Sequence, residues 1–309
     1  MSEDRNRGYK GGMSKERIEH FIQTRMTEDG LQGIGLPGVK LFRTTTPIAC
    51  APAVYDPTIV AIVSGAKEAV LDGHRFVYDS QRYMCCPMSM PVEAGTPQAS
   101  EQTPLLGVMI TLDTRLMREL AIELEQAAGA IRPPKGDSVP QGLVLAPWDA
   151  AFGDALLRLL LLADTAADAA VLGHGRLREL YYAVLRGEAG FAARRAFGVG
   201  NEIARAIEYL SCHLNETVTI DDVASQVGMS RAVLHRKFKQ ATTMSPLQFM
   251  KSMRLNNAAM KIAGGMTVSE AASEVGYVSA SQFSREFKRL YSQSPRQWSQ
   301  SIDLPAGLA

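Results

Sequence analysis

The chain has 309 residues, a formal net charge of +1 at pH 7, and 46% hydrophobic against 21% charged residues. This balance is typical of a globular protein and excludes a collagen-like or wholly disordered chain. At roughly 100–200 residues per domain, the length predicts two domains, each able to bury its own core. The first ten residues are polar and no apolar run is long enough to span a bilayer, so we expect a cytoplasmic protein with no membrane partner.

A polar lead-in with one predicted helix, Ser14–Met26, precedes a series of short β-rich runs between residues 38 and 112. Pro, Gly and Asp separate these runs, and Asp72-Gly73 between two of them is typical of a two-residue hairpin turn. Several short strands at regular spacing predict a small barrel or sandwich. The predicted strands are Val39–Thr44, Ile59–Ser64, Glu68–Leu71, Arg75–Tyr78, Tyr83–Cys86 and Leu106–Leu112.

From residue 114 onward the apolar residues recur at helical spacing, which predicts helices at Thr114–Ala128, Ala150–Ala163 and Arg176–Arg186. The leucines between positions 156 and 161 exceed what one buried stripe needs. We expect part of their surface to pair with a second copy of the chain; packing against the barrel of the same chain is the alternative. Gly187–Val199, rich in Ala, Gly and Arg, is a candidate hinge before the last domain.

The last hundred residues contain an internal repeat, which is the strongest signal in the sequence. Its blocks recur in the same order at an offset of about 48–49 residues, which indicates a duplicated unit. The matched pairs are Ala224–Gly228 with Ala272–Gly276, Arg236–Lys239 with Arg285–Lys288, and Ser245–Phe249 with Ser294–Trp298.

Each copy of the repeat has the local chemistry of a helix, a short glycine turn and a second helix. Thr219 is a good N-cap, and Gly228 supplies a left-handed turn residue between the two helices. Ser230 caps the second helix, on which Leu234 and Phe238 form an inward pair at i and i+4. This pattern predicts a helix-turn-helix unit, whose second helix enters the major groove of DNA. The matching features of the second copy are Gly276, Phe283 and Phe287, with a helix near Ala280–Tyr291.

A long helix is predicted to join the two units. Ser245-Pro246 supplies an N-cap followed by proline at the first helical position, and Gly264-Gly265 ends a helix of about Leu247–Ala263. At 1.5 Å per residue this rod is roughly 25 Å long. Successive major-groove faces on one side of B-DNA lie roughly 34 Å apart, so one chain can read two groove segments. Residues 201–300 hold 12 Lys and Arg against 8 Asp and Glu, a balance compatible with nucleic acid.

Residues 201–300, a third of the chain, resemble the DNA-binding domain of the AraC/XylS family of bacterial regulators. The resemblance lies in A-S-x-V-G-M-S, R-x-F-K and S-P-L-Q-F, in Arg254-Leu255 and Ala258-Ala259, and in the second set from Gly276-Tyr277 to Ser294-Pro295. Residues 38–112 more loosely resemble the small cupin-like barrel at the N-terminus of many such regulators. That resemblance lies in Pro37–Arg43 and Tyr55-Asp56-Pro57.

The resemblance implies which side chains contact DNA bases and which contact phosphates. Two of the implied base-contacting positions are alanine, which limits readout there to apolar contact, for instance with a thymine methyl group. A solvated surface position is the alternative for His235, and ion pairs within the fold are the alternative for Arg236 and Arg285. The implied base contacts are Ala232, His235, Arg236, Ala280, Ser281, Gln282 and Arg285. Phosphate contacts, which position a protein without specifying sequence, are expected from Ser230, Arg231, Lys239, Ser279, Ser284 and Lys288.

The N-terminal barrel is expected to hold an effector pocket rather than a catalytic metal site. A barrel metalloenzyme needs paired histidines and a carboxylate on neighbouring strands, whereas the predicted strands and turns offer His74 alone. We therefore expect no metal, no cofactor and no catalytic residue. Phe76, Tyr78 and Tyr83 are candidates to line a pocket for a small-molecule effector. Ordinary core packing is the alternative for these three aromatic residues.

The cysteines at positions 50, 85, 86 and 212 fit no metal-binding spacing and are expected to be reduced in the cytosol. Cys85 and Cys86 are adjacent on a predicted strand, so that one of them faces the barrel interior. A thiol there can sense an oxidant or electrophile if its pKa is lowered, and Arg82 is nearby in sequence. The alternative is that both cysteines are small buried hydrophobes.

The sequence predicts an α+β protein with a cupin-like β-barrel and a helical appendage in residues 1–190. Residues 200–300 are predicted to form an all-α domain with two helix-turn-helix units. The predicted function is a sequence-specific transcription regulator, a homodimer on double-stranded operator DNA, controlled by a small-molecule or electrophile and redox signal at the barrel. RNA polymerase is a further candidate partner, and activation and repression both stay open. The alternatives are a barrel enzyme with an appended DNA-binding domain and an architectural or partner-binding helical domain.

Overall fold

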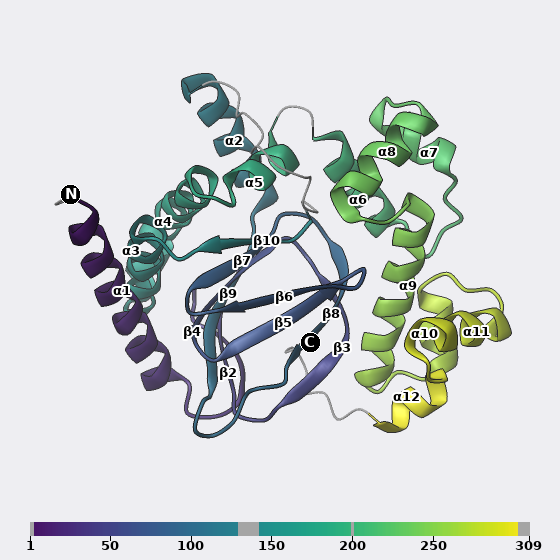
Figure 1. The fold of residues 1–309 in the computed structure, drawn as a ribbon, viewed down its shortest axis with the longest axis horizontal. Coiled ribbons are helices and arrows are strands. Elements are labelled where there is room, and N and C mark those ends of the chain that lie inside the picture. Colours follow the sequence, from purple (N-terminus) through teal and green to yellow (C-terminus); the bar gives the residue numbers. More distant parts are fainter. Residues whose placement is uncertain (1–2, 129–141, 199–200, 302–309) are drawn as a thin grey trace.

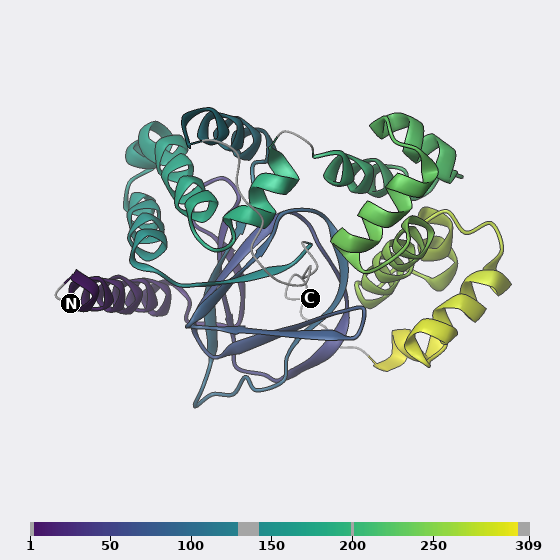
Figure 2. The ribbon, with the colours of Figure 1, turned by 45° about the horizontal axis from the view of Figure 1, so that its top comes forward.

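The computed structural model describes residues 3–128, 142–198 and 201–301. Strands between residues 30 and 147 form the middle of the molecule, with the N-terminal helices along one side and the C-terminal helices along the other (Figure 1). Figure 2 shows the same separation after a turn of 45°. We call residues 3–198 the N-terminal domain and residues 201–301 the C-terminal domain. Within the described residues, no helix is long and apolar enough to cross a membrane.

The strands of the N-terminal domain form a six-stranded and a four-stranded sheet. They are β1 (Gly30–Gly33), β2 (Val39–Thr44), β3 (Ile48–Tyr55), β4 (Thr58–Ser64), β5 (Ala66–Leu71), β6 (His74–Asp79), β7 (Arg82–Cys86), β8 (Met90–Thr96), β9 (Leu105–Thr111) and β10 (Val144–Pro147). The larger sheet has the order β1-β2-β9-β4-β7-β10, and the smaller has the order β3-β8-β5-β6. Every pairing is antiparallel. The α+β class is therefore confirmed, whereas within the described residues no hydrogen-bonded ladder closes the two sheets into the expected barrel.

Each of the six predicted strands is present, with ends shifted by at most two residues. The strands that the sequence pattern missed, β1, β3, β8 and β10, carry Ala, Pro or Gly where β-branched residues are usual. In β8, Gly95 allows a close approach of β3, because a Cβ at that position would lie 2.7 Å from the backbone nitrogen of Cys50. Packing between neighbours, rather than intrinsic propensity, therefore accounts for these strands.

The Asp72-Gly73 hairpin is confirmed. It joins β5 to β6, with Leu71 paired directly with His74. Asp72 has φ 48° and Gly73 has φ 78°. Two successive left-handed residues form the type I′ turn that suits the twist of a two-residue hairpin.

The helices of the N-terminal domain cover the larger sheet. They are α1 (Glu3–Arg25), α2 (Thr114–Ala128), α3 (Ala150–Leu160), a short 3₁₀ helix η1 (Leu161–Asp164), α4 (Ala166–Arg186) and α5 (Gly190–Phe197). The predicted hinge at Gly187–Val199 is wrong for residues 190–197, which form α5; Val199 lies outside the described residues. Ala193 and Phe197 are buried there, and a Cβ at Gly190 would lie 2.2 Å from the carbonyl oxygen of Leu185. The small residues thus serve close helix packing rather than flexibility.

The leucine-rich surface of α3 is buried within the chain. Leu156, Leu159 and Leu160 are fully buried, and Leu157 is 6% exposed. Leu161, at the start of η1, is 39% exposed. Four of the five leucines are therefore covered within the chain, where α3 packs on α1 and α4, and pairing of this surface with a second copy stays a prediction for Leu161 alone.

The C-terminal domain is all-helical in the described residues. Its helices are α6 (Glu202–Cys212), α7 (Ile220–Val227), α8 (Arg231–Thr242), α9 (Pro246–Ala263), α10 (Val268–Glu274), α11 (Ala280–Tyr291) and α12 (Pro295–Ser301). The N-caps follow the sequence pattern: Thr219 and Ser245 form capping boxes with Asp222 and Gln248, and the Ser230 hydroxyl accepts from the backbone N–H of Val233. The helix-turn-helix pairs are therefore α7 with α8 and α10 with α11.

The two turn glycines differ in what surrounds them. Gly228 has φ 68° and Gly276 has φ 84°, so both occupy the left-handed region. A Cβ at Gly228 would meet nothing within 4 Å, whereas a Cβ at Gly276 would lie 2.8 Å from the carbonyl oxygen of Leu214. Gly276 is thus a contact point between the second unit and the loop that precedes α7 in the first.

The side chain of Arg254 on α9 holds the same loop. Its Nε donates to the carbonyl oxygen of Leu214 at 2.6 Å, and its Nη2 donates to that of Glu216 at 2.6 Å. Arg254 thus provides hydrogen bonds to two carbonyl groups of this loop. Arg254 and Gly276 together fix the first unit against the second.

We predict that Gly276→Ala destabilises the chain more than Gly228→Ala does. Either change places a Cβ in the left-handed region, at a cost of about 1–2 kcal/mol. Only Gly276→Ala also creates an overlap with backbone, which adds about 1–3 kcal/mol. Urea unfolding followed by circular dichroism measures both free energies. Equal losses for the two variants would contradict the close contact at Gly276.

Candidate nucleic-acid interface

The second helix of each unit is anchored by one face and exposed on the other. Leu234 and Phe238 on α8, and Phe283 and Phe287 on α11, are fully buried. Phe238 packs edge-on against Phe249 of α9, with ring centroids 5.3 Å apart. The predicted anchors are confirmed, and the opposite face of each helix is left to solvent (Figure 1).

The residues implied to contact bases all lie on these exposed faces. Ala232, His235 and Arg236 are exposed on α8. On α11 the exposed residues are Ala280, Ser281, Gln282 and Arg285. The structure therefore groups each set on one helix surface, as a groove-reading helix requires. Base contact itself stays a prediction.

The alternative of internal ion pairs is not seen for the two candidate base-reading arginines. Within the described part of the chain, neither Arg236 nor Arg285 forms an ion pair. Arg231 differs, because its guanidinium makes a two-pronged pair with Asp221 of α7. An arginine already engaged by a carboxylate is a weaker phosphate ligand than a free one.

The other candidate phosphate contacts divide into caps and free cations. Ser230 and Ser279 accept backbone N–H bonds as N-caps, while Ser284 is half-buried on α11. Lys239 and Lys288 are exposed. The two serine caps lie at the N-terminal ends of α8 and α11 and the two lysines in their last turns, and phosphate contact stays a prediction.

A polar network beside α11 escaped the sequence analysis. Lys251 of α9 pairs with Glu286 of α11 at 2.7 Å, and the Tyr277 hydroxyl donates to the other oxygen of Glu286 at 2.8 Å. Burial pushes the pKa of Glu286 upward, but the hydrogen bonds from Lys251 and Tyr277 outweigh it and lower the pKa overall. The ionised carboxylate ties α11 to α9. The only sequence signal for Glu286 was its position as the variable residue of the repeated R-x-F-K block.

The three aromatic residues proposed for an effector pocket do not converge on one cavity. The Tyr78 and Tyr55 hydroxyls are hydrogen-bonded at 2.8 Å between strands of the smaller sheet, and both tyrosines are buried. Tyr83 instead stacks on Phe152 of α3, with ring centroids 4.0 Å apart. Tyr83 therefore faces the helical layer, whereas Tyr78 and the half-buried Phe76 lie on β6 of the other sheet. This packing favours the alternative of ordinary core residues, and an effector pocket at these positions stays a prediction.

Neither adjacent cysteine has the environment of a sensor thiol. Cys85 and Cys86 are 1% and 0% exposed. Burial raises the pKa of Cys85 to about 12 and raises that of Cys86 well above its ordinary value. The Cys86 thiol lies in hydrogen-bond range of the carbonyl oxygens of Met88 and Gly142. A reactive thiol needs access and a lowered pKa, so these features favour the alternative of small buried hydrophobes.

We predict that Cys212 reacts with iodoacetamide in the folded chain while Cys85 and Cys86 do not. Cys212 is exposed, whereas the other two are buried and protonated. Peptide mass spectrometry at neutral pH, before and after urea unfolding, measures each site. Modification of Cys85 or Cys86 as fast as that of Cys212 would restore the sensor hypothesis.

Two family models match the chain. Residues 35–192, about half of it, match the AraC-type transcriptional regulator N-terminus, and residues 223–301 match a helix-turn-helix domain. The second match contains both recognition helices described above.

Curated relatives match over part of the chain. An uncharacterized HTH-type transcriptional regulator of Haemophilus influenzae is 38% identical over 86 residues, 28% of this chain and 29% of that protein. The raffinose operon transcriptional regulatory protein RafR of Pediococcus pentosaceus is 26% identical over 150 residues, 48% of this chain and 54% of RafR. The chain spans only 13% of the length of the Staphylococcus aureus HTH-type regulators that it matches.

The solved structures of ToxT from Vibrio cholerae share the fold over most of both chains. One has a TM-score of 0.53 at 13% identity and covers 86% of this chain and 98% of ToxT. Another, with an unsaturated fatty acid bound, has a TM-score of 0.52 and covers 90% of this chain. At this identity the likeness concerns the fold alone.

Proposed function

The chain belongs to the AraC-type family of transcriptional regulators, and we propose that it reads operator DNA with α8 and α11 in two successive segments of the major groove. The observation that carries this proposal is the pair of anchored helices with free polar faces. Arg236 and Arg285 occupy matching places on those faces and have no ion-pair partner among the described residues. We also propose that residues 1–190 and 200–300 are the functional division of the chain.

The contacts are proposed to divide by chemistry. Arg236 and Arg285 suit bidentate bonds to guanine, His235, Ser281 and Gln282 suit single hydrogen bonds to base edges, and the exposed alanines suit thymine methyl groups. Lys239 and Lys288 suit phosphates, with the helix N-termini at Ser230 and Ser279 as further donors.

The N-terminal domain is proposed to receive a small-molecule signal. Support comes from its family match and from the ToxT fold, which binds an unsaturated fatty acid in one crystal structure. The high pKa and burial of Cys85 and Cys86 give less support to an oxidant or electrophile as the signal. RNA polymerase stays a proposed partner to which no residue is assigned.

Dimerisation is proposed to use α4 rather than α3. Val171 and Leu172 on α4 are 78% and 45% exposed, and Leu161 of the adjacent η1 is 39% exposed. Exposed apolar side chains gathered on neighbouring elements are typical of an association surface. Because the α3 leucines are already covered, α4 is the better candidate in the described residues.

We predict that Val171→Asp shifts the chain from dimer to monomer, because a carboxylate cannot be buried unpaired in an apolar interface. Light scattering after size exclusion measures the mass. Val278→Asp, at a fully exposed position in the turn before α11, is the control because it makes the same change of residue and charge. A monomeric wild type, or a variant that still dimerises, would remove α4 from consideration.

We predict that Arg236→Ala and Arg285→Ala each weaken binding to a selected operator by about 1–3 kcal/mol and relax the preference at one base position. Lys288→Ala should weaken binding to all sequences alike and reduce the slope of log affinity against log salt by about 0.9. Selection from a random duplex pool provides the operator, and fluorescence anisotropy provides the affinities. Arg115→Ala, on exposed α2, is the control. Unchanged operator affinity in both arginine variants would sink the assignment of α8 and α11 as reading helices.

A further inference from the structure

A buried asparagine on α9 connects the two domains. Asn256 is 5% exposed, and its Nδ2 donates to the carbonyl oxygens of Ala53 in β3 and Val92 in β8, each at 2.8 Å. Ala53 and Val92 are direct partners in the β3–β8 ladder. Both N–H groups of the amide are therefore used on the N-terminal sheet.

The other end of the same amide holds the second recognition helix. The hydroxyl of Tyr291, the last residue of α11, donates to Asn256 Oδ1 at 2.6 Å. The Tyr291 ring also packs on Phe287 and Trp298. One side chain thus joins the sheet, the long helix and α11. Because a buried amide left without partners costs about 1–3 kcal/mol per group, the docked domains are favourable only in the register that keeps these three bonds.

The first helix-turn-helix unit also touches the N-terminal domain. The backbone N–H of Gly142, just before β10, donates to the carbonyl oxygen of Ala241 near the end of α8 at 3.2 Å. Helix α9 packs along β3 and β8, and Ala51 of β3 belongs to the same apolar cluster as Leu255 and Phe287. Both recognition helices are therefore held at their C-terminal ends.

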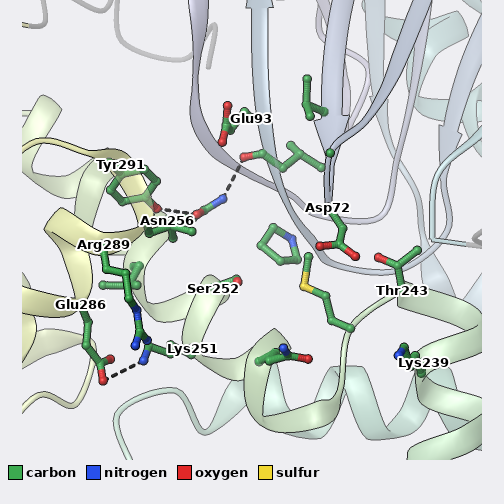
Figure 3. A pocket seen from close by; sticks show the side chains of 18 residues that line it. Asp72, Glu93, Lys239, Thr243, Lys251, Ser252, Asn256, Glu286, Arg289 and Tyr291 are labelled. Atoms are coloured by element: carbon green, nitrogen blue, oxygen red, sulfur yellow. Dashed lines mark hydrogen bonds and ion pairs between the residues drawn. The ribbon is translucent and has the colours of Figure 1, made fainter.

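Beside Asn256 and Tyr291 lies a cleft of about 570 Å³ between the tip of the β5–β6 hairpin and the ends of α8 and α11 (Figure 3). Asp72 and Glu93 line it from the N-terminal domain, and Lys239 and Arg289 line it from the C-terminal domain. Within the described residues none of these four side chains forms an ion pair. Side chains of opposite charge from the two domains therefore line one cleft, and the attraction between them is weakened by salt.

We propose that Asn256 and Tyr291 form a polar lock between the domains, and that the locked state competes with DNA phosphates for Lys239 and Arg289. Asn256 is a positioning residue in this proposal: it touches no DNA but sets where both recognition helices sit. The competition rests on the proposed function, whereas the lock itself does not. Opening the lock frees two cations for the DNA backbone.

Two single substitutions separate the two ends of the lock in the full chain. Asn256→Asp still accepts from Tyr291 but cannot donate to Ala53 and Val92, and its carboxylate faces their carbonyl oxygens. Tyr291→Phe keeps the sheet contacts and removes only the bond to α11. Asn257→Asp is the matched control, because Asn257 is the next residue on α9, is half-buried, and bonds only within its helix to the Met253 carbonyl oxygen.

Hydrogen exchange followed by mass spectrometry, without DNA, tests the lock. Asn256→Asp should speed exchange in β3, β8 and α9 together, Tyr291→Phe should speed it only at the end of α11, and Asn257→Asp should match wild type. If Asn256→Asp exchanges like wild type in β3 and β8, the lock is refuted. Should Asn256→Asp fail to fold by circular dichroism, Asn256→Ala replaces it, with the same segments read against the same control.

Anisotropy with a short fluorescein-labelled duplex of mixed sequence tests the competition. Asn256→Asp should bind about 3- to 10-fold more tightly than Asn257→Asp, with a salt slope steeper by up to about 2 because two more phosphates are engaged. Asp72→Asn should give a smaller gain in the same direction. Equal or weaker binding by Asn256→Asp would overturn the competition. If no variant binds the duplex while exchange still shows the lock, the proposed function fails and the lock stands.

Discussion

Helix α9 packs against the N-terminal sheet and against both helix-turn-helix units, and the positions of α8 and α11 follow from that constraint. Phe249 near its start receives Phe238 of α8, and Leu255 and Ile262 further along share a cluster with Phe283 and Phe287 of α11. Short helices are marginal in water on their own, so α8 and α11 depend on this burial for their stability. Because α9 takes their apolar faces, their polar faces are left to solvent, where DNA can reach them.

The two units also behave as one block because their connection is made by backbone as well as by side chains. Arg254 binds the carbonyl oxygens of Leu214 and Glu216, and Gly276 lets the second turn lie against the same loop. Lys251 and Glu286 add an ion pair between α9 and α11. A joint of this kind has little freedom to slide, so the protein itself sets the spacing between α8 and α11.

Local chemistry explains which parts of this structure were predictable from the sequence. Helix α11 was expected near Ala280–Tyr291 and forms over those residues, since its N-cap, its turn glycine and its i, i+4 anchors lie within one short segment. The Asp72-Gly73 hairpin was predictable for the same reason. Strands β3 and β8 were not, because their Ala, Pro and Gly residues favour a strand only where a neighbouring strand comes close.

The site residues could be predicted where their positions depend on nearby sequence, and could not be predicted where they depend on contacts with distant residues. The exposed faces of α8 and α11 followed from periodicity, but the direction of Tyr83 depends on Phe152, which is far away in sequence. Asn256 and Asn257 are adjacent and look equivalent in the sequence. Asn256 donates to the carbonyl oxygens of Ala53 and Val92 in the N-terminal domain, whereas Asn257 donates within its own helix. This difference depends on another domain and is not visible in the sequence.

That difference bears on how a signal in one domain can reach the other. An apolar contact between α9 and the sheet is non-directional, and it would tolerate small slides with a gradual loss of energy. The Asn256 amide is directional: two carbonyls and one hydroxyl must lie within hydrogen-bond range at once. A shift of α9 by one residue along the sheet would break both bonds to the sheet together and leave their groups buried. Docking governed by such a contact is either made or lost, and a two-state contact can pass a change in the N-terminal sheet to both recognition helices.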